Sequence, residues 1–91
     1  MDGVDEPPVT VFSTSNCLEC EATKWFLRKR GVAFREVDVA ADPAAATLVE
    51  RLNGGLRSVP TLVAGGRALT MSPFDRARLD DFLRDTGLIG E

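Results

Sequence analysis

The chain has 91 residues, of which 44% are hydrophobic and 27% are charged, a length and balance that predict one globular domain. Its formal net charge is −3, and because no block of like charges stands out, we expect no nucleic-acid partner. No apolar run approaches the roughly 20 residues of a membrane span, and the acidic start does not resemble a signal peptide, so we expect a cytoplasmic protein without a membrane partner.

The first elements expected are a strand and a helix. Residues 1–8 are interpreted as a flexible polar lead, and residues 9–91 as a single domain. A β-type run, Val9–Ser13, opens this domain. The segment Thr14-Ser15-Asn16 has the chemistry of a turn and helix N-cap, and a helix is predicted from Leu18 to Arg30. The face of this helix that we expect to be buried carries Leu18, Ala22, Trp25 and Phe26.

A second strand and a second helix are expected in the middle of the chain. The strand covers about Ala33–Val39. Asp42 suits the N-cap of the helix, with Pro43 at its first position, and Asn53-Gly54-Gly55 ends it. The sequence therefore predicts a second strand–helix unit after the first.

The last part of the chain predicts a hairpin and a helix. Strands are expected at Thr61–Ala64 and about Arg67–Leu69, joined by the two-residue turn Gly65-Gly66. Ser72 is the expected N-cap of a helix that ends near Asp85. The order β-α-β-α-β-β-α predicts an α/β fold in which three helices flank a mixed four-stranded sheet. The inward side chains expected of the last helix are Phe74, Leu79, Phe82 and Leu83.

The two cysteines of the chain form a Cys17-Leu18-Glu19-Cys20 motif at the junction of the first strand and helix. A disulfide between them closes too small a loop to contribute much stability. In a reducing compartment such a pair is catalytic or metal-binding rather than structural. The chain has no histidine, so a zinc site would need ligands from a second chain or from carboxylates.

Over residues 9–86 the order of elements resembles the thioredoxin fold in its minimal, glutaredoxin-like form. Three local matches carry the resemblance: the cysteine motif followed by Lys24, the segment Ser58-Val59-Pro60-Thr61, which is similar to the superfamily's cis-proline loop, and Asp38 at the end of the second strand. The resemblance implies a cis peptide bond before Pro60, which leaves the backbone of Val59 free to pair with a docked thiol or peptide.

Two subfamilies share further motifs with this chain. The segment from Asn53 to Thr61, followed by Leu69-Thr70, is similar to the mycoredoxins, whereas Cys20-Glu21-Ala22-Thr23-Lys24 and Ser72-Pro73-Phe74 resemble NrdH-type redoxins. The chain departs from most glutaredoxins at Glu19, where they place an aromatic residue, and at Thr70-Met71-Ser72-Pro73, where they carry a Gly-Gly-Asp-like turn.

The resemblance implies a dithiol–disulfide oxidoreductase without a bound cofactor or metal. Cys17, at the N-terminus of a helix that stabilises a thiolate, is the expected nucleophile, and Cys20 is the expected resolving residue. Expected partners of the monomer are disulfide-containing proteins and a small thiol: mycothiol, bacillithiol or glutathione. The alternatives are an NrdH-type donor to ribonucleotide reductase that thioredoxin reductase reduces, and an Fe–S or Zn binding module built on the same cysteines.

Several other residues are candidates for binding or tuning. Glu19 is expected to oppose ionisation of the Cys17 thiol and so to make the disulfide couple more reducing, while Lys24 acts as a distant positive charge. The expected substrate- and thiol-binding residues are Ser15, Leu18, Glu19, Arg57, Val59, Pro60, Thr70 and Met71.

Overall fold

The computed structural model describes residues 6–90, so of the expected lead only residues 6–8 fall within it. The predicted order of elements is confirmed, and most boundaries agree with the prediction to within one residue. The elements are β1 (Val9–Ser13), α1 (Leu18–Lys29), β2 (Phe34–Asp38), α2 (Pro43–Leu52), β3 (Thr61–Ala64), β4 (Arg67–Thr70) and α3 (Arg76–Asp85).

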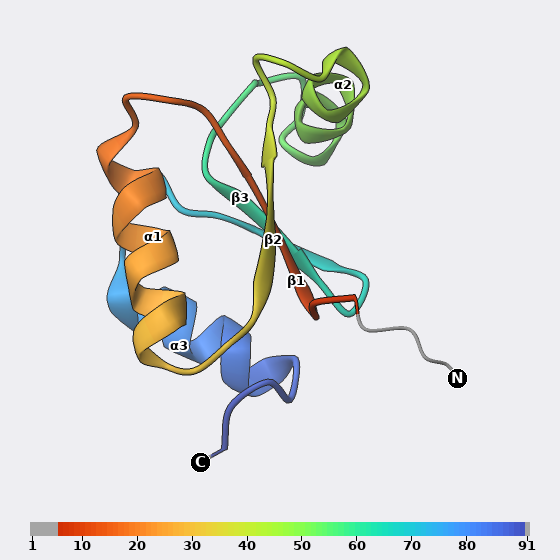
Figure 1. Ribbon diagram of the computed structural model, residues 1–91. Helices are drawn as coiled ribbons and strands as arrows, with labels where there is room; N and C mark the ends of the chain where they lie inside the picture. The colour runs from red at the N-terminus through yellow and green to blue at the C-terminus, as the bar shows by residue number, and fades with distance from the viewer. Residues whose placement is uncertain (1–5, 91) are drawn as a thin grey trace.

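The four strands form one mixed sheet in the order β2-β1-β3-β4. Strand β1 pairs in parallel with β2, with Ser13 opposite Asp38, and β3 pairs antiparallel with both β1 and β4. Helices α1 and α3 cover one face of this sheet and α2 covers the other (Figure 1). The predicted mixed sheet with three flanking helices is therefore confirmed.

Each face of the sheet has its own hydrophobic core. Along β1 successive side chains point to opposite faces, so that Val9 and Val11 join the core with α1 and α3, whereas Phe12 joins the core with α2. The tail residues Leu88 and Ile89 pack against the first of these cores. Strand β1 is thus a central strand, and the short segment after its last residue, Ser13, leads to the start of α1.

The predicted buried face of α1 was wrong in part: Phe26 is buried in the core, as expected, and Ala22 is partly buried, but the other two residues are exposed. Trp25 is 60% exposed and Leu18 is 85% exposed. The side of the helix that packs on the sheet instead carries Cys20, Thr23 and Leu27, which are fully buried and follow the i, i+3, i+7 spacing of one helical stripe. The large apolar side chains Leu18 and Trp25, also seven residues apart, gave a second stripe that the sequence alone did not distinguish from the buried one.

The predicted cap of the last helix was also wrong, although its end at Asp85 is confirmed. Asp75, not Ser72, is the N-cap: its carboxylate accepts a hydrogen bond from the backbone N–H of Arg78 at 3.2 Å. Both residues are good caps, but residues 71–75 are not helical, so the aspartate lies at the boundary. Phe74 lies before the helix and packs edge-on against Phe26 of α1.

Candidate active site

Cys17 is itself the N-cap of α1. Its backbone is extended, and its Sγ accepts a hydrogen bond from the backbone N–H of Cys20 at 3.1 Å. The segment before it forms the predicted turn, but Asn16 has a φ of 58°, in the left-handed region, so the capping role passes to the next residue. The sulfur of Cys17 therefore lies among the free N–H groups at the positive end of the helix dipole, where negative charge is stabilised.

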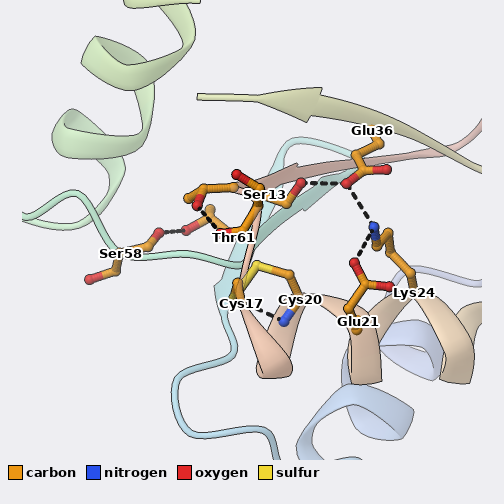
Figure 2. The surroundings of a disulfide bond; sticks show 10 residues. Ser13, Cys17, Cys20, Glu21, Lys24, Glu36, Ser58 and Thr61 are labelled. Atoms are coloured by element: carbon orange, nitrogen blue, oxygen red, sulfur yellow. Dashed lines mark hydrogen bonds and ion pairs between the residues drawn. A yellow bond between two sulfur atoms is a disulfide. The ribbon is translucent and has the colours of Figure 1, made fainter. Parts of the chain in front are cut away.

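The two cysteines are joined as a disulfide, with their Cα atoms 5.2 Å apart. Cys20 is fully buried, while Cys17 is partly exposed. Figure 2 shows the disulfide at the first turn of α1, with Ser13 and Thr61 on its sheet side. An incoming thiol or disulfide thus reaches the sulfur of Cys17 more readily than that of Cys20.

Lys24 is buried and fully paired rather than solvated. Its ammonium lies 2.8 Å from a carboxylate oxygen of Glu36 on β2 and 2.9 Å from one of Glu21. The hydroxyl of Ser13 donates to the same oxygen of Glu36 at 2.6 Å (Figure 2). Hydrogen bonds to the two carboxylates raise the pKa of Lys24, and the hydrogen bonds from Lys24 and Ser13 lower the pKa of Glu36. The single ammonium of Lys24 is therefore paired with two carboxylates.

The Val59–Pro60 peptide bond is cis, as expected. The carbonyl of Pro60 accepts a hydrogen bond from the backbone N–H of Met71 at 2.9 Å, and strand β3 begins only at Thr61. Within residues 6–90, no backbone hydrogen bond of the sheet or the turns uses Val59. The N–H and C=O groups of this residue are therefore without backbone partners in the described part of the chain.

A second hydrogen-bond network joins the loop before Pro60 to the sheet, and its centre was missed at the sequence level. The side-chain amide of Asn53, just after α2, donates to the hydroxyl of Thr61 at 3.1 Å and to the carbonyl of Val49 at 2.8 Å. Its carbonyl oxygen accepts a hydrogen bond from the hydroxyl of Thr70. In the sequence Asn53 is part of a helix stop and of the segment that is similar to the mycoredoxins, and nothing local indicates its partners on β3 and β4.

The other expected binding residues divide between the surface and the interior. Ser15 and Leu18 are exposed, and Glu19 is partly exposed, around the cysteine motif. Arg57 is 57% exposed and paired with Glu50 through contacts of 3.1 and 3.2 Å. Met71 is fully buried in the core between the sheet, α1 and α3, so its side chain presents no surface to a ligand.

Between residues 6 and 90, no group of three or more acidic or cysteine side chains is arranged to hold a metal ion. None of the helices in this range is both long and apolar enough to cross a membrane.

Comparison with known proteins decides the family. The family model described as glutaredoxin matches residues 9–69, which include both cysteines and Pro60. The chain belongs to the glutaredoxin family. Proteins of the glutaredoxin family are thiol–disulfide oxidoreductases. This chain is a glutaredoxin- or NrdH-like redoxin in which Cys17 and Cys20 are joined as a disulfide.

This glutaredoxin is similar to two named relatives and to one solved structure. It is 38% identical over 71 residues to Rv3198A of Mycobacterium tuberculosis, whose name gives glutaredoxin as a provisional assignment, covering 77% of this chain and 84% of that one. It is 35% identical over 57 residues to the glutaredoxin-like protein NrdH of Salmonella typhimurium, and the match covers 63% of this chain and 68% of that protein. The solved structure of NrdH-redoxin from Escherichia coli superposes with a TM-score of 0.68 at 26% identity, and the superposition covers 80% of this chain and 91% of that one. The minimal thioredoxin fold is thereby confirmed.

Proposed function

We propose that this glutaredoxin reduces protein disulfides and mixed disulfides with electrons from a low-molecular-weight thiol, of the mycothiol, bacillithiol or glutathione class. The observation that carries the proposal is the unpaired backbone of Val59, next to the cis proline. A short peptide-like thiol pairs there as an added strand while its sulfur exchanges with Cys17. Similarity to the mycobacterial relative over 84% of that protein's length adds support.

The reaction proceeds through two thiol–disulfide exchanges. The Cys17 thiolate attacks a substrate sulfur, and one substrate thiolate leaves. Cys20 then attacks the sulfur of Cys17, the disulfide between the two cysteines closes, and the second substrate thiolate leaves. Exposure of Cys17 and burial of Cys20 support this division of roles. The reducing cytoplasm is the compartment proposed, since it supplies the small thiol that reopens the disulfide.

The second candidate is an NrdH-type donor that thioredoxin reductase reduces and that serves ribonucleotide reductase. Its support comes from relatives named NrdH, and the solved Escherichia coli protein is described as having a thioredoxin-like activity profile. The chemistry at Cys17 is the same in both candidates, and only the electron source and the acceptor differ.

The rate of NADPH oxidation with oxidised protein separates the two candidates. One assay supplies thioredoxin reductase alone, and the other supplies mycothiol, bacillithiol or glutathione with its own disulfide reductase. The proposal expects fast turnover only with a small thiol, and Cys17→Ser should abolish it. Fast turnover with thioredoxin reductase alone would replace the proposal with the NrdH-type function.

A further inference from the structure

A buried hydroxyl without a partner lies on the helix that carries the cysteines. Thr23 is fully buried, and its Oγ1 makes no hydrogen bond to any part of the chain between residues 6 and 90. A buried threonine in a helix ordinarily donates to the carbonyl three or four residues earlier, and here that bond is absent. An unsatisfied buried polar group is destabilising, so Thr23 requires an explanation beyond packing.

The position of Thr23 on the helix indicates its partner. Cys20 lies one turn earlier, on the same helical face, and is also fully buried. Helical side chains lean toward the N-terminus of the helix, so the side chain of Thr23 leans toward the turn that carries Cys20. The side chains one turn later, Phe26 and Leu27, have no hydrogen-bond acceptor. The other side chain one turn earlier, Glu19, is partly exposed and can hydrogen-bond water.

The redox state of Cys20 decides whether this hydroxyl has a good acceptor. In the disulfide, the Cys20 sulfur is bonded to that of Cys17, and a neutral sulfur is a weak acceptor. Reduction frees the sulfur as a thiol, which can pair with the hydroxyl as acceptor and as donor, whereas a disulfide sulfur has no proton to donate. Ionisation of the thiol then makes the sulfur a charged and much stronger acceptor. We propose that Thr23 is a positioning residue for Cys20: its hydroxyl donates to the Cys20 sulfur in the reduced protein and has no partner in the disulfide form.

This hydrogen bond bears on one step of the reaction, and the inference rests on the proposed resolving role of Cys20. In that step the Cys20 thiol releases its proton to solvent, and the thiolate attacks the Cys17 sulfur of a mixed disulfide. The bond between Cys17 and the substrate sulfur breaks, the Cys17–Cys20 bond forms, and the substrate sulfur leaves with the electron pair as a thiolate. The Thr23 hydroxyl loses its acceptor as the ring closes, which favours the dithiol form over the disulfide.

The test is the redox equilibrium of the full chain in dithiothreitol buffers, with free thiols trapped and counted by intact mass. Thr23→Val removes the hydroxyl and keeps the shape of the side chain. We expect it to favour the disulfide about tenfold, which lowers the reduction potential by about 30 mV for a two-electron couple. Its melting temperature should rise in the disulfide form, where the orphaned hydroxyl is gone, and fall in the reduced form. Thr23→Ala carries the same test if the valine variant folds poorly.

Two control variants distinguish this role from a structural one. Thr23→Ser keeps the hydroxyl and should retain the wild-type potential, and Thr47→Val removes an exposed helical hydroxyl and should not shift it. An unchanged potential in Thr23→Val, or equal changes in melting temperature for the two redox forms, would overturn the inference. The dithiothreitol buffers take the place of the cellular electron donor, so such a result would leave the proposed function standing. If Cys17 and Cys20 never formed a disulfide in these buffers, the proposed function itself would be contradicted.

Discussion

The ammonium of Lys24 lies 2.8 Å from the carboxylate of Glu36, a contact that joins the first helix to the edge strand β2 beside the Cys17–Cys20 disulfide. Glu21, one turn earlier on the helix, also pairs with Lys24, and the hydroxyl of Ser13 on the central strand donates to the same carboxylate oxygen of Glu36. The positive charge near the cysteines is therefore balanced by two negative ones. We infer that stabilisation of the Cys17 thiolate comes chiefly from the N-terminus of α1.

Removal of the Lys24 charge should destabilise the fold more than it changes thiol chemistry. Lys24→Met leaves Glu36 and Glu21 without their partner, and because both carboxylates are partly exposed and can be rehydrated, we expect a loss of about 1–2 kcal/mol. Urea unfolding measures this loss. The matched control is Lys29→Met, at an exposed position on the same helix, which should cost under about 0.5 kcal/mol. Equal losses in the two variants would contradict the structural role of Lys24.

The same ion pair gives stability a defined pH dependence. The pKa of Glu36 is lowered from its ordinary value of 4.5, so its contribution is present above 4.5 and is lost as pH falls through the lower folded value. The pKa of Lys24 is raised from 10.5, so its contribution is present below 10.5 and is lost as pH rises through the higher folded value. The melting temperatures of wild type and Glu36→Gln should differ by a constant amount near neutral pH and converge in acid. A difference that persists in acid would contradict this account.

Thr70 is expected to contribute to stability rather than to thiol binding, because its hydroxyl is donated to Asn53. Thr70→Val leaves the Asn53 carbonyl without that donor and should cost about 1–2 kcal/mol, with little change in KM for the small thiol. Thermal unfolding and steady-state kinetics test both parts. A raised KM in a variant of unchanged stability would restore Thr70 to the set of ligand contacts.

We expect Leu18 to contact protein substrates, because it lies between the cysteines in the sequence and is 85% exposed. Leu18→Ser should leave stability unchanged and raise KM for a protein disulfide by roughly three- to tenfold, as expected for the partial burial of one leucine on docking. Trp25→Gln, also exposed on α1 but two turns farther along, is the control and should leave KM unchanged. Equal effects from both would indicate a wider docking surface.

Much of this fold could be predicted from local signals. The β-type run Val9–Ser13 and the pairing of Asp42 with Pro43 as cap and first residue gave boundaries that the structure confirms. The buried face of α1 was predicted only in part, because the residues that pack on the sheet include polar ones such as Thr23, whereas the large apolar side chain of Trp25 is exposed.

The candidate site could be predicted only where a short local motif marks its residues. The cysteine motif and Pro60 are of this kind. The partnership of Lys24 with Glu36 depends on how β2 lies beside β1, and that of Asn53 with Thr70 depends on how β4 lies beside β3. No sequence pattern indicates either pair, since hydrogen bonds between distant segments exist only once the sheet has formed.

The most direct test of the account is which cysteine is trapped when the reaction is interrupted. Cys20→Ser and Cys17→Ser are each incubated with the disulfide of a small thiol, and the adducts are located by intact mass and peptide mapping. The account predicts one adduct on Cys17 in Cys20→Ser, and no turnover by Cys17→Ser with a protein disulfide. An adduct that forms first on Cys20, or turnover that survives the loss of Cys17, would contradict it.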